Sequence, residues 1–528
     1  MDNSTTYIRT GRPEFDNLFP MVKSFLEKDV LEMEIDGKKI RGYRSPDTRS
    51  VWIRDYSDMI RGFKYFEHDL ISTISHFAEN QSDNGRIFDY FTTSPEKLPC
   101  EKENWTKYVR VPVEADVEYR FIKAAYLSWQ STGNDDWVYK LIPKMEKALD
   151  YIFNNNQRFD KKNKLVKRPY TIDTWDFAYT SGKHDWLQFQ IDDDTYWGIF
   201  HGDNSGYYEA LMILAFLLEY FNKKEKAQHY YCLAAELVRR INEICWNGSF
   251  YTHFVKLNPV VIEGVDEGSQ LSLSNPVNIN RGITDQRMAS SIIGEYQKRR
   301  RNSKSFAEWY SIDPPFPDGI FGDEKLISGA YINGGIMPLV GGELAKAAFD
   351  NGYESYGCDI IKRYYKMISE KNETFLWYFP DGTPSGVDNS TSPEASPTDG
   401  WGSSAMLYAL VEGLVGVEDK YKKFQKVKLS PRWLAAGVYD AEVNIKYDQS
   451  GSFVYYMFTC NEDEIKLIVN SQESLISFNI LIPSDKQVNK VTFDGFDIDF
   501  TNQTIEKSKY INFDKELVKK AVVLISLV

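Results

Sequence analysis

The sequence predicts a mainly α-helical protein in which helical hairpins form a closed (α/α)6 toroid, followed by a small antiparallel β-sandwich-like domain. Apolar residues recur with the period of an α-helix from about residue 14 to 417, and with the period of a β-strand after that. The chain of 528 residues is also too long for one ordinary hydrophobic core. We therefore expect the toroid over 1–420 and the second domain over 421–528.

The clearest helical hairpin lies at 113–154. Residues 113–132 place Val117, Phe121 and Trp129 on one stripe before Gly133 ends the pattern. Residues 137–154 carry a second apolar stripe and form the expected antiparallel partner. The same pattern predicts further helices over 205–221, 224–244, 285–299, 334–351, 353–369 and 403–414.

Long loops rich in glycine, proline, aspartate and aromatic residues separate the predicted hairpins. Structureless loops of this length are uncommon in compact domains and usually carry function. Because these loops connect successive hairpins, we expect the functional residues to gather at one end of the toroid. The loops span 82–112, 158–204, 246–284, 303–333 and 371–402.

The C-terminal part has the texture of a β domain. Short alternating segments are separated by Asn, Asp, Ser and Gly, a pattern typical of strands joined by turns. The change of pattern places the boundary near 424–431. The predicted strands span 439–447, 453–459, 464–469, 476–482 and 491–493.

Charge and hydropathy exclude several classes of protein. The net charge of −13 argues against nucleic acid and anionic membranes as partners, because the overall field repels both. The chain contains no run of about 18 apolar residues, so we expect a soluble protein with no membrane-spanning segment. The first residues lack the basic and apolar regions of a signal peptide. We expect a cytoplasmic protein, or a secreted or periplasmic one if a signal peptide has been removed.

The five cysteines and six histidines are scattered and show no metal-binding spacing. We therefore expect neither a metal centre nor a cofactor. The aromatic content is more informative, because 15% of the residues are Phe, Trp or Tyr and many of them stand in polar loops. Aromatic rings in polar loops suit stacking on the apolar face of a sugar ring, so we expect an oligosaccharide or glycoside as the ligand.

Three segments combine tryptophan with carboxylates: 52–55, 170–177 and 392–403. In the second segment Asp176 stands between two aromatic residues, which disfavours its charged form and raises its pKa, as a general acid requires. In the third segment Glu394 has no capping duty, whereas Asp399 could bind sugar or simply cap the next helix. Two carboxylates facing each other across one pocket are what glycoside hydrolysis needs.

These segments resemble motifs of the six-hairpin glycosidases, which include trehalases, glucoamylases and debranching-type glucosidases. Trp52-Ile53-Arg54-Asp55 is similar to the W-x-R-D motif of their substrate pocket. Thr174-Trp175-Asp176-Phe177 resembles the W-D-F of trehalases, whose Asp is the catalytic acid. Glu394 and the Gly400-Trp401-Gly402 that follows it resemble the segment of the catalytic base. The segments around Asn204 and Asn333 resemble helix and loop motifs of the debranching-type enzymes.

The resemblance implies an inverting, exo-acting glycoside hydrolase that removes a terminal sugar from an α-glucoside-like oligosaccharide. It makes Asp176 the general acid and Glu394 the general base, with about 6.5–9.5 Å between their carboxyl groups. Two alternatives stay open: a sugar phosphorylase on the same toroid, and a carbohydrate-binding protein without catalysis. The expected substrate-binding residues are Trp52, Arg54, Asp55, Asp173, Trp175, Asn204, Asn333, Asp399 and Trp401.

Overall fold

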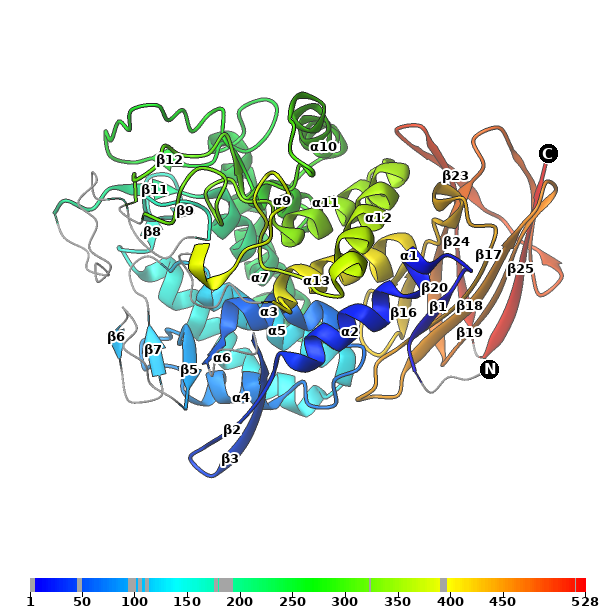
Figure 1. The fold of residues 1–528 in the computed structure, drawn as a ribbon. Coiled ribbons are helices and arrows are strands. Elements are labelled where there is room, and N and C mark those ends of the chain that lie inside the picture. Colours follow the sequence, from blue (N-terminus) through cyan, green and yellow to red (C-terminus); the bar gives the residue numbers. More distant parts are fainter. Residues whose placement is uncertain are drawn as a thin grey trace.

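A computed structural model describes residues 5–44, 50–93, 101–102, 107–109, 114–174, 179, 193–321, 324–389, 397–517 and 519–528. Helices dominate the chain up to residue 414, and strands dominate it from residue 417 onward (Figure 1). The predicted order of a mainly helical part and a C-terminal antiparallel sheet is therefore confirmed.

Six helices form the centre of the helical part, and each packs against the next in chain order until the last returns to the first. They are buried on most sides; all 11 residues of the first, for example, are buried. A helix buried all round belongs to the interior of a large protein. The six are α3 (Ile53–Phe63), α5 (Val117–Thr132), α7 (His201–Tyr220), α9 (Ser274–Asn280), α11 (Pro338–Asp350) and α13 (Gly400–Tyr408).

A second set of helices covers this centre, each packed on a central helix. They carry the one-sided apolar stripes that the sequence shows. In α6, for example, Leu141, Met145 and Leu149 are buried among polar neighbours. The covering helices are α2 (Leu18–Lys28) on α13, α4 (Ser72–Glu79) on α5, α6 (Asp135–Asn154) on α5, α8 (Lys224–Ile244) on α7, α10 (Gln286–Asn302) on α9, and α12 (Glu354–Lys371) on α11, with the short α1 (Pro13–Asp16) beside α12.

The start of α10 depends on a side-chain cap. Asp285 Oδ1 accepts a hydrogen bond from the backbone N–H of Met288 at 2.7 Å. We expect Asp285→Ala to lower the free energy of unfolding by about 1 kcal/mol, because the helix then loses the partner of one N-terminal N–H. Urea denaturation measures this change. Asp285→Asn should retain most of the stability, and an equal loss in both variants would contradict the capping role.

Short strands lie before the first central helix and within four of the segments predicted as loops. All pairings between these described strands are antiparallel. Most have two or three residues, too few to show alternation in the sequence, and the hairpin β2–β3 was also missed. They are β2 (Val30–Ile35), β3 (Lys38–Tyr43), β4 (Ser50–Trp52), β5 (Tyr90–Thr92), β6 (Glu101–Lys102), β7 (Lys107–Val109), β8 (Phe159–Asp160), β9 (Leu165–Val166), β10 (Arg168–Pro169), β11 (Trp197–Ile199), β12 (Val255–Lys256), β13 (Leu271–Ser272) and β14 (Ile312–Asp313).

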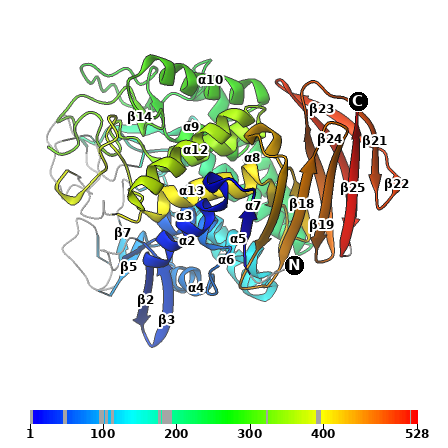
Figure 2. The same cartoon turned by 45° about the vertical axis from the view of Figure 1, so that its right-hand side comes forward.

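The C-terminal strands form two sheets at one end of the molecule (Figure 2). The first has the order β1-β17-β18-β19-β25-β21-β22, with β1 (Tyr7–Arg9), β17 (Asp440–Lys446), β18 (Phe453–Cys460), β19 (Glu464–Ser471), β25 (Lys520–Leu527), β21 (Val488–Phe493) and β22 (Phe496–Asp497). The second has the order β15-β16-β20-β24-β23, with β15 (Val417–Asp419), β16 (Lys426–Leu429), β20 (Ser474–Ile482), β24 (Ser508–Leu517) and β23 (Thr501–Ile505).

One pair in the second sheet corrects the expectation of a wholly antiparallel domain. Strands β16 and β20 run parallel, with Val427 opposite Ile476. Between them the chain leaves for the other sheet, forms β17, β18 and β19 there, and returns. A hairpin would reverse the strand, whereas a crossover of this length allows the parallel direction.

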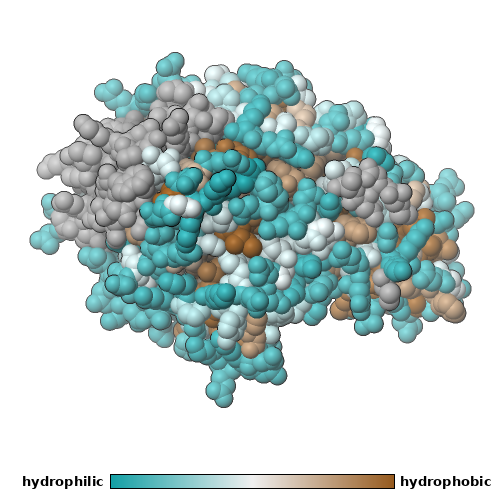
Figure 3. All heavy atoms as spheres, turned by 90° about the horizontal axis from the view of Figure 1, so that it is seen from below, coloured by the Kyte–Doolittle hydropathy of each residue, from teal (hydrophilic) through white to brown (hydrophobic). Residues whose placement is uncertain are grey.

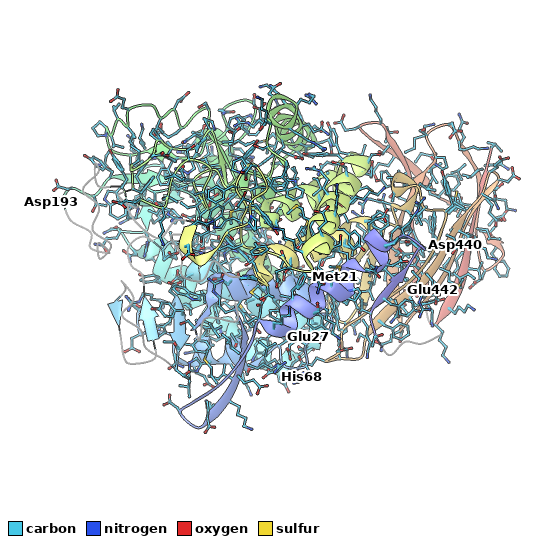
Figure 4. All side chains as sticks on the ribbon, in the orientation of Figure 1. Met21, Glu27, His68, Asp193, Asp440 and Glu442 are labelled. Carbon is cyan, nitrogen blue, oxygen red and sulfur yellow. The ribbon has the colours of Figure 1, made fainter. Side chains whose placement is uncertain are left out.

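The first residues of the chain belong to the β part, although the prediction places them in the helical part. Strand β1 pairs with β17 in an antiparallel register that joins Ile8 to Val443. The hydroxyl of Tyr7 donates to Glu442 Oε1 at 2.8 Å, and Figure 4 shows Glu442 beside this N-terminal strand. The first described residues of the chain and its C-terminal end therefore both lie at the β sheets (Figure 1).

No described helix is long and apolar enough to cross a membrane. On the face seen in Figure 3, the coloured surface is mostly hydrophilic and its apolar residues form small, separate groups.

Candidate functional site

The N-terminal ends of the six central helices converge on one buried cavity of about 30 Å³. Each helix contributes at least one residue near its start, and the loop that ends at Thr174 contributes two. This volume holds only a water molecule or two. We call the described residues that line it the floor of the candidate site. The lining residues are Asp58, Asp116, Tyr119, Arg120, Arg168, Asp173, Thr174, Phe200, Asp203, Leu273, Ser274, Val277, Arg281, Leu339, Glu343 and Trp401.

This position explains the unusual number of buried carboxylates. The N-terminus of a helix carries a partial positive charge and unpaired N–H groups, both of which favour anions. Five acidic residues and three arginines line the cavity, so acidic groups outnumber the arginines by two. The acids are Asp58, Asp116, Asp173, Asp203 and Glu343, and the arginines are Arg120, Arg168 and Arg281.

Asp58 is the central acceptor of this network. Its Oδ2 lies 2.5 Å from Arg120 Nη1 and accepts the indole N–H of Trp401 at 2.8 Å. Burial by itself would raise the pKa of Asp58, but Arg120 and Arg61 outweigh it and hold this pKa well below the usual range. Asp58 is therefore a fixed anion that orients the Trp401 ring from 343 residues away.

Arg54 joins the first and second predicted segments. Its Nε donates to Asp116 Oδ2 at 2.8 Å and its Nη2 to Glu114. Its Nη1 reaches the carbonyl oxygen of Thr174 at 3.5 Å. The guanidinium thus holds the described end of the Thr174 loop against the start of α5. Arg54 does not line the cavity itself. It fixes two residues that do, Asp116 and Thr174.

Asp173 is the carboxyl group in the floor that is best suited to hold a proton. It is buried, and its Oδ2 accepts hydrogen bonds from the backbone N–H and the hydroxyl of Ser274 at 3.1 and 2.8 Å. Burial raises the pKa of Asp173 to about 7, although the Ser274 hydroxyl and Arg168 oppose the shift. A carboxyl group with such a pKa exchanges protons near neutral pH.

This pKa predicts a pH-dependent stability. The pKa of Asp173 in the fold exceeds its unfolded value of about 3.9, so the native state holds an extra proton between about pH 4 and 7. The contribution of Asp173 to stability therefore falls as the pH rises through that window. Asp173→Asn cannot lose a proton, so we expect it to gain stability relative to the wild type as the pH rises. Urea denaturation at several pH values measures this, and a difference that does not change with pH would contradict it.

Arg168 and Asp203 form a buried pair that sequence reasoning missed. Their side chains lie 3.3 Å apart, and burial raises the pKa of Asp203 while Arg168 lowers it. Asp203 stands next to Asn204 at the start of α7, so the segment was singled out but Asp203 was not. The available signal was an acid in the first turn of the helix.

Asn204 and Asn333 were predicted to bind substrate, but their amides hold loop backbone. Asn204 accepts from the N–H of Val166 at 2.7 Å and donates to its carbonyl at 2.9 Å. Asn333 bonds to both backbone groups of Phe316 in the same way, at 2.7 and 3.1 Å. Neither residue lines the cavity. Each side chain instead pairs with the N–H and C=O of a buried residue, as a neighbouring strand would. An asparagine suits this position because its amide both donates and accepts.

Trp52, Asp55 and Asp399 lie around the cavity but are not among the described residues that line it. Trp52 stacks on Tyr90 with 3.9 Å between ring centroids, and Asp55 pairs with Arg44 at 2.7 Å. Asp399 accepts from the N–H of Gly402 at 2.8 Å and so caps α13, the alternative that the sequence left open. Burial raises the pKa of Asp399 to about 6.

Trp175, Asp176 and Glu394 lie outside the described residues, so the structure describes neither of the two expected catalytic carboxylates. Among the described residues, no group of three or more His, Cys, Asp or Glu side chains could hold a metal ion.

Comparisons by sequence found nothing: no protein-family model and no curated protein matches this chain. Comparisons by structure found enzymes. An α-L-rhamnosidase from Dictyoglumus thermophilum is 11% identical with a TM-score of 0.61, over 99% of this chain and 50% of that one. A family GH78 rhamnosidase of a Bacillus species is 15% identical with a TM-score of 0.58, over 91% and 43%. The chain thus spans half or less of the length of these rhamnosidases.

A GH63 mannosylglycerate hydrolase from Thermus thermophilus has nearly its whole chain matched. It is 11% identical with a TM-score of 0.53, over 74% of this chain and 99% of that one. At such identities the likeness concerns the fold. The chain therefore shares its fold with these glycoside hydrolases.

Proposed function

We propose that this protein is a glycoside hydrolase whose active site lies over the cavity at the start of the six central helices. One observation carries the proposal: buried acids, arginines and the ring of Trp401 meet where six helix N-termini converge. An apolar ring beside polar groups held in place by ion pairs suits a sugar, which has an apolar face and many hydroxyl groups.

The finer architecture is part of the proposal. The six hairpins close into an (α/α)6 toroid, because the helix contacts return from α13 to α3. All loops that precede the central helices then open at the same end. In this proposal the segments that lead to Trp52, Thr174 and Trp401 surround one mouth and form a single active site within residues 1–420.

The catalytic pair of the proposal is Asp176 as general acid and Glu394 as general base. Thr174 lines the floor, and Asp176 follows it by two residues, so the chain keeps the two Cα atoms within about 7 Å. Glu394 precedes the helix of Trp401 by six residues. The sugar would lie over the floor, where Asp176 protonates the leaving oxygen and Glu394 takes a proton from the attacking water.

The reaction proposed is exo-acting hydrolysis with inversion, on an α-glucoside-like oligosaccharide. The structural neighbours are named for rhamnosides and mannosylglycerate, so the first screen should include those substrates beside α- and β-glucosides. Each substrate is tested with and without inorganic phosphate. We expect released sugar that does not depend on phosphate. Phosphate-dependent release of a sugar phosphate would establish the phosphorylase, and binding without turnover the non-catalytic alternative.

Proton NMR of the first-formed sugar tests the stereochemistry. We expect the anomer opposite to that of the substrate, because in the proposed mechanism water attacks the sugar on the face opposite to the leaving group. Retention of configuration would overturn the roles of Asp176 and Glu394 even if both residues proved essential.

A further inference from the structure

A second cavity lies deeper among the central helices, beyond the floor of the proposed active site. Its volume is about 310 Å³, within the range of small-molecule sites. It lies between α5 and α7, toward their C-terminal ends, and Arg281 at the end of α9 lines both cavities.

The base of this cavity carries more positive than negative charge. Glu209 Oε2 lies 3.3 Å from Lys123 Nζ and 3.2 Å from Arg281 Nε, so one carboxylate faces two cations. Both cations are largely buried, with 11% and 4% of their side chains exposed. Burial lowers the pKa of Lys123 although Glu209 and Asp58 oppose the shift, and Arg61 adds to it. Two buried cations that share one lining carboxylate are costly, and an added anion would relieve that cost.

The walls of the cavity are apolar. Tyr126 and Leu127 of α5 face Met212, Ile213 and Phe216 of α7 across it, and all five are partly exposed. The rings of Tyr126 and Phe216 meet edge to face with 6.1 Å between centroids. Exposed apolar groups packed around a charged base are the ordinary composition of a ligand pocket.

We propose that this cavity binds a small monoanion with an apolar body, such as an aromatic or branched carboxylate or sulfonate. The acid group lies between Lys123 and Arg281, and the apolar body lies between α5 and α7. This proposal does not depend on the proposed function.

The test uses the whole protein and the fluorescent probe 8-anilino-1-naphthalenesulfonate, an aromatic body with one negative charge. Fluorescence and calorimetric titration should show one saturable site. The neutral analogue N-phenyl-1-naphthylamine should bind at least about tenfold more weakly, because it lacks the charge-assisted contact. Equal affinity for the two probes, or binding at many weak sites only, would overturn the proposal.

Two variants locate the site. Lys123→Met removes one cation at the base, and Met212→Glu places a like charge in the wall. Each should weaken binding of the sulfonate at least about tenfold. Leu233→Glu is the matched control, because it adds the same charge on the partly exposed face of α8 away from the cavity. Circular dichroism confirms that each variant is folded. Unchanged affinity in a folded Met212→Glu variant would rule the cavity out.

Discussion

Replacing Asp176 with asparagine should lower kcat by about 10²- to 10⁴-fold for glycosides with a poor leaving group, because the variant cannot protonate the departing oxygen. Aryl glycosides with an activated leaving group need less protonation and should lose much less. Steady-state kinetics on one aryl glycoside and one disaccharide of the same sugar measure the difference.

The variant Glu394→Gln is the matched comparison. It removes the proposed base, so the attack of water slows and all substrates should lose activity alike. If Asp176→Asn reduced activity equally on both substrates while Glu394→Gln discriminated between them, the two roles would have to be exchanged. If neither variant lost activity, the described carboxyl group best placed to act as the acid would be Asp173, which lines the cavity floor with a pKa of about 7.

The largest expected loss of stability follows from replacing Asp58 with alanine. Asp58 is the counter-ion of Arg120 and also lies 3.5 Å from Arg61. Its removal leaves Arg120 with Asp116, at 3.4 Å, and Arg61 with Glu343, so each buried cation loses one of its two carboxylate partners. It also takes the acceptor from the Trp401 indole. We expect the free energy of unfolding to fall by about 3–5 kcal/mol. Urea denaturation followed by circular dichroism measures this fall.

Two controls separate the buried charge from other effects. Asp58→Asn retains a hydrogen-bond acceptor for Trp401 but not the charge, so it should fall between alanine and the wild type. Glu79→Ala removes the partner of Lys38 in an exposed pair at 2.6 Å, and exposed pairs contribute little. A loss in Asp58→Ala as small as that in Glu79→Ala would show that the buried network is not needed for folding.

The covering helices were predictable because the spacing of their apolar residues shows which face is buried. The buried residues of α6 and α8 recur at helical spacing, since one face of each helix meets the core and the other meets water. The central helix α3 also has apolar residues at helical spacing, Ile53, Tyr56, Ile60 and Phe63, but its charged face is buried as well. The sequence pattern therefore cannot tell a central helix, whose charges are paired inside the protein, from a covering helix, whose polar face meets water.

The candidate site was predictable only in part for the same reason. The segments around Arg54, Asp173 and Trp401 were recognised from aromatic residues beside carboxylates, and the structure brings them to one end of the central helices. The acids at 58, 116, 203 and 343 and the arginines at 120, 168 and 281 were missed. Each looks like an ordinary surface charge until its partner, often in another element of the fold, is known.

The sequence by itself determined the order of a helical part and a β part, and the loops in which chemistry should be sought. Those properties rest on periodicity and composition, which are local. Only the tertiary structure decided which polar side chains do which work: Asn204 and Asn333 hold backbone, Asp399 caps a helix, and Asp58 fixes Trp401. The same residue types serve as caps, supports or ligands. Their role depends on partners brought close by folding and on burial, which sets the strength of each charge interaction.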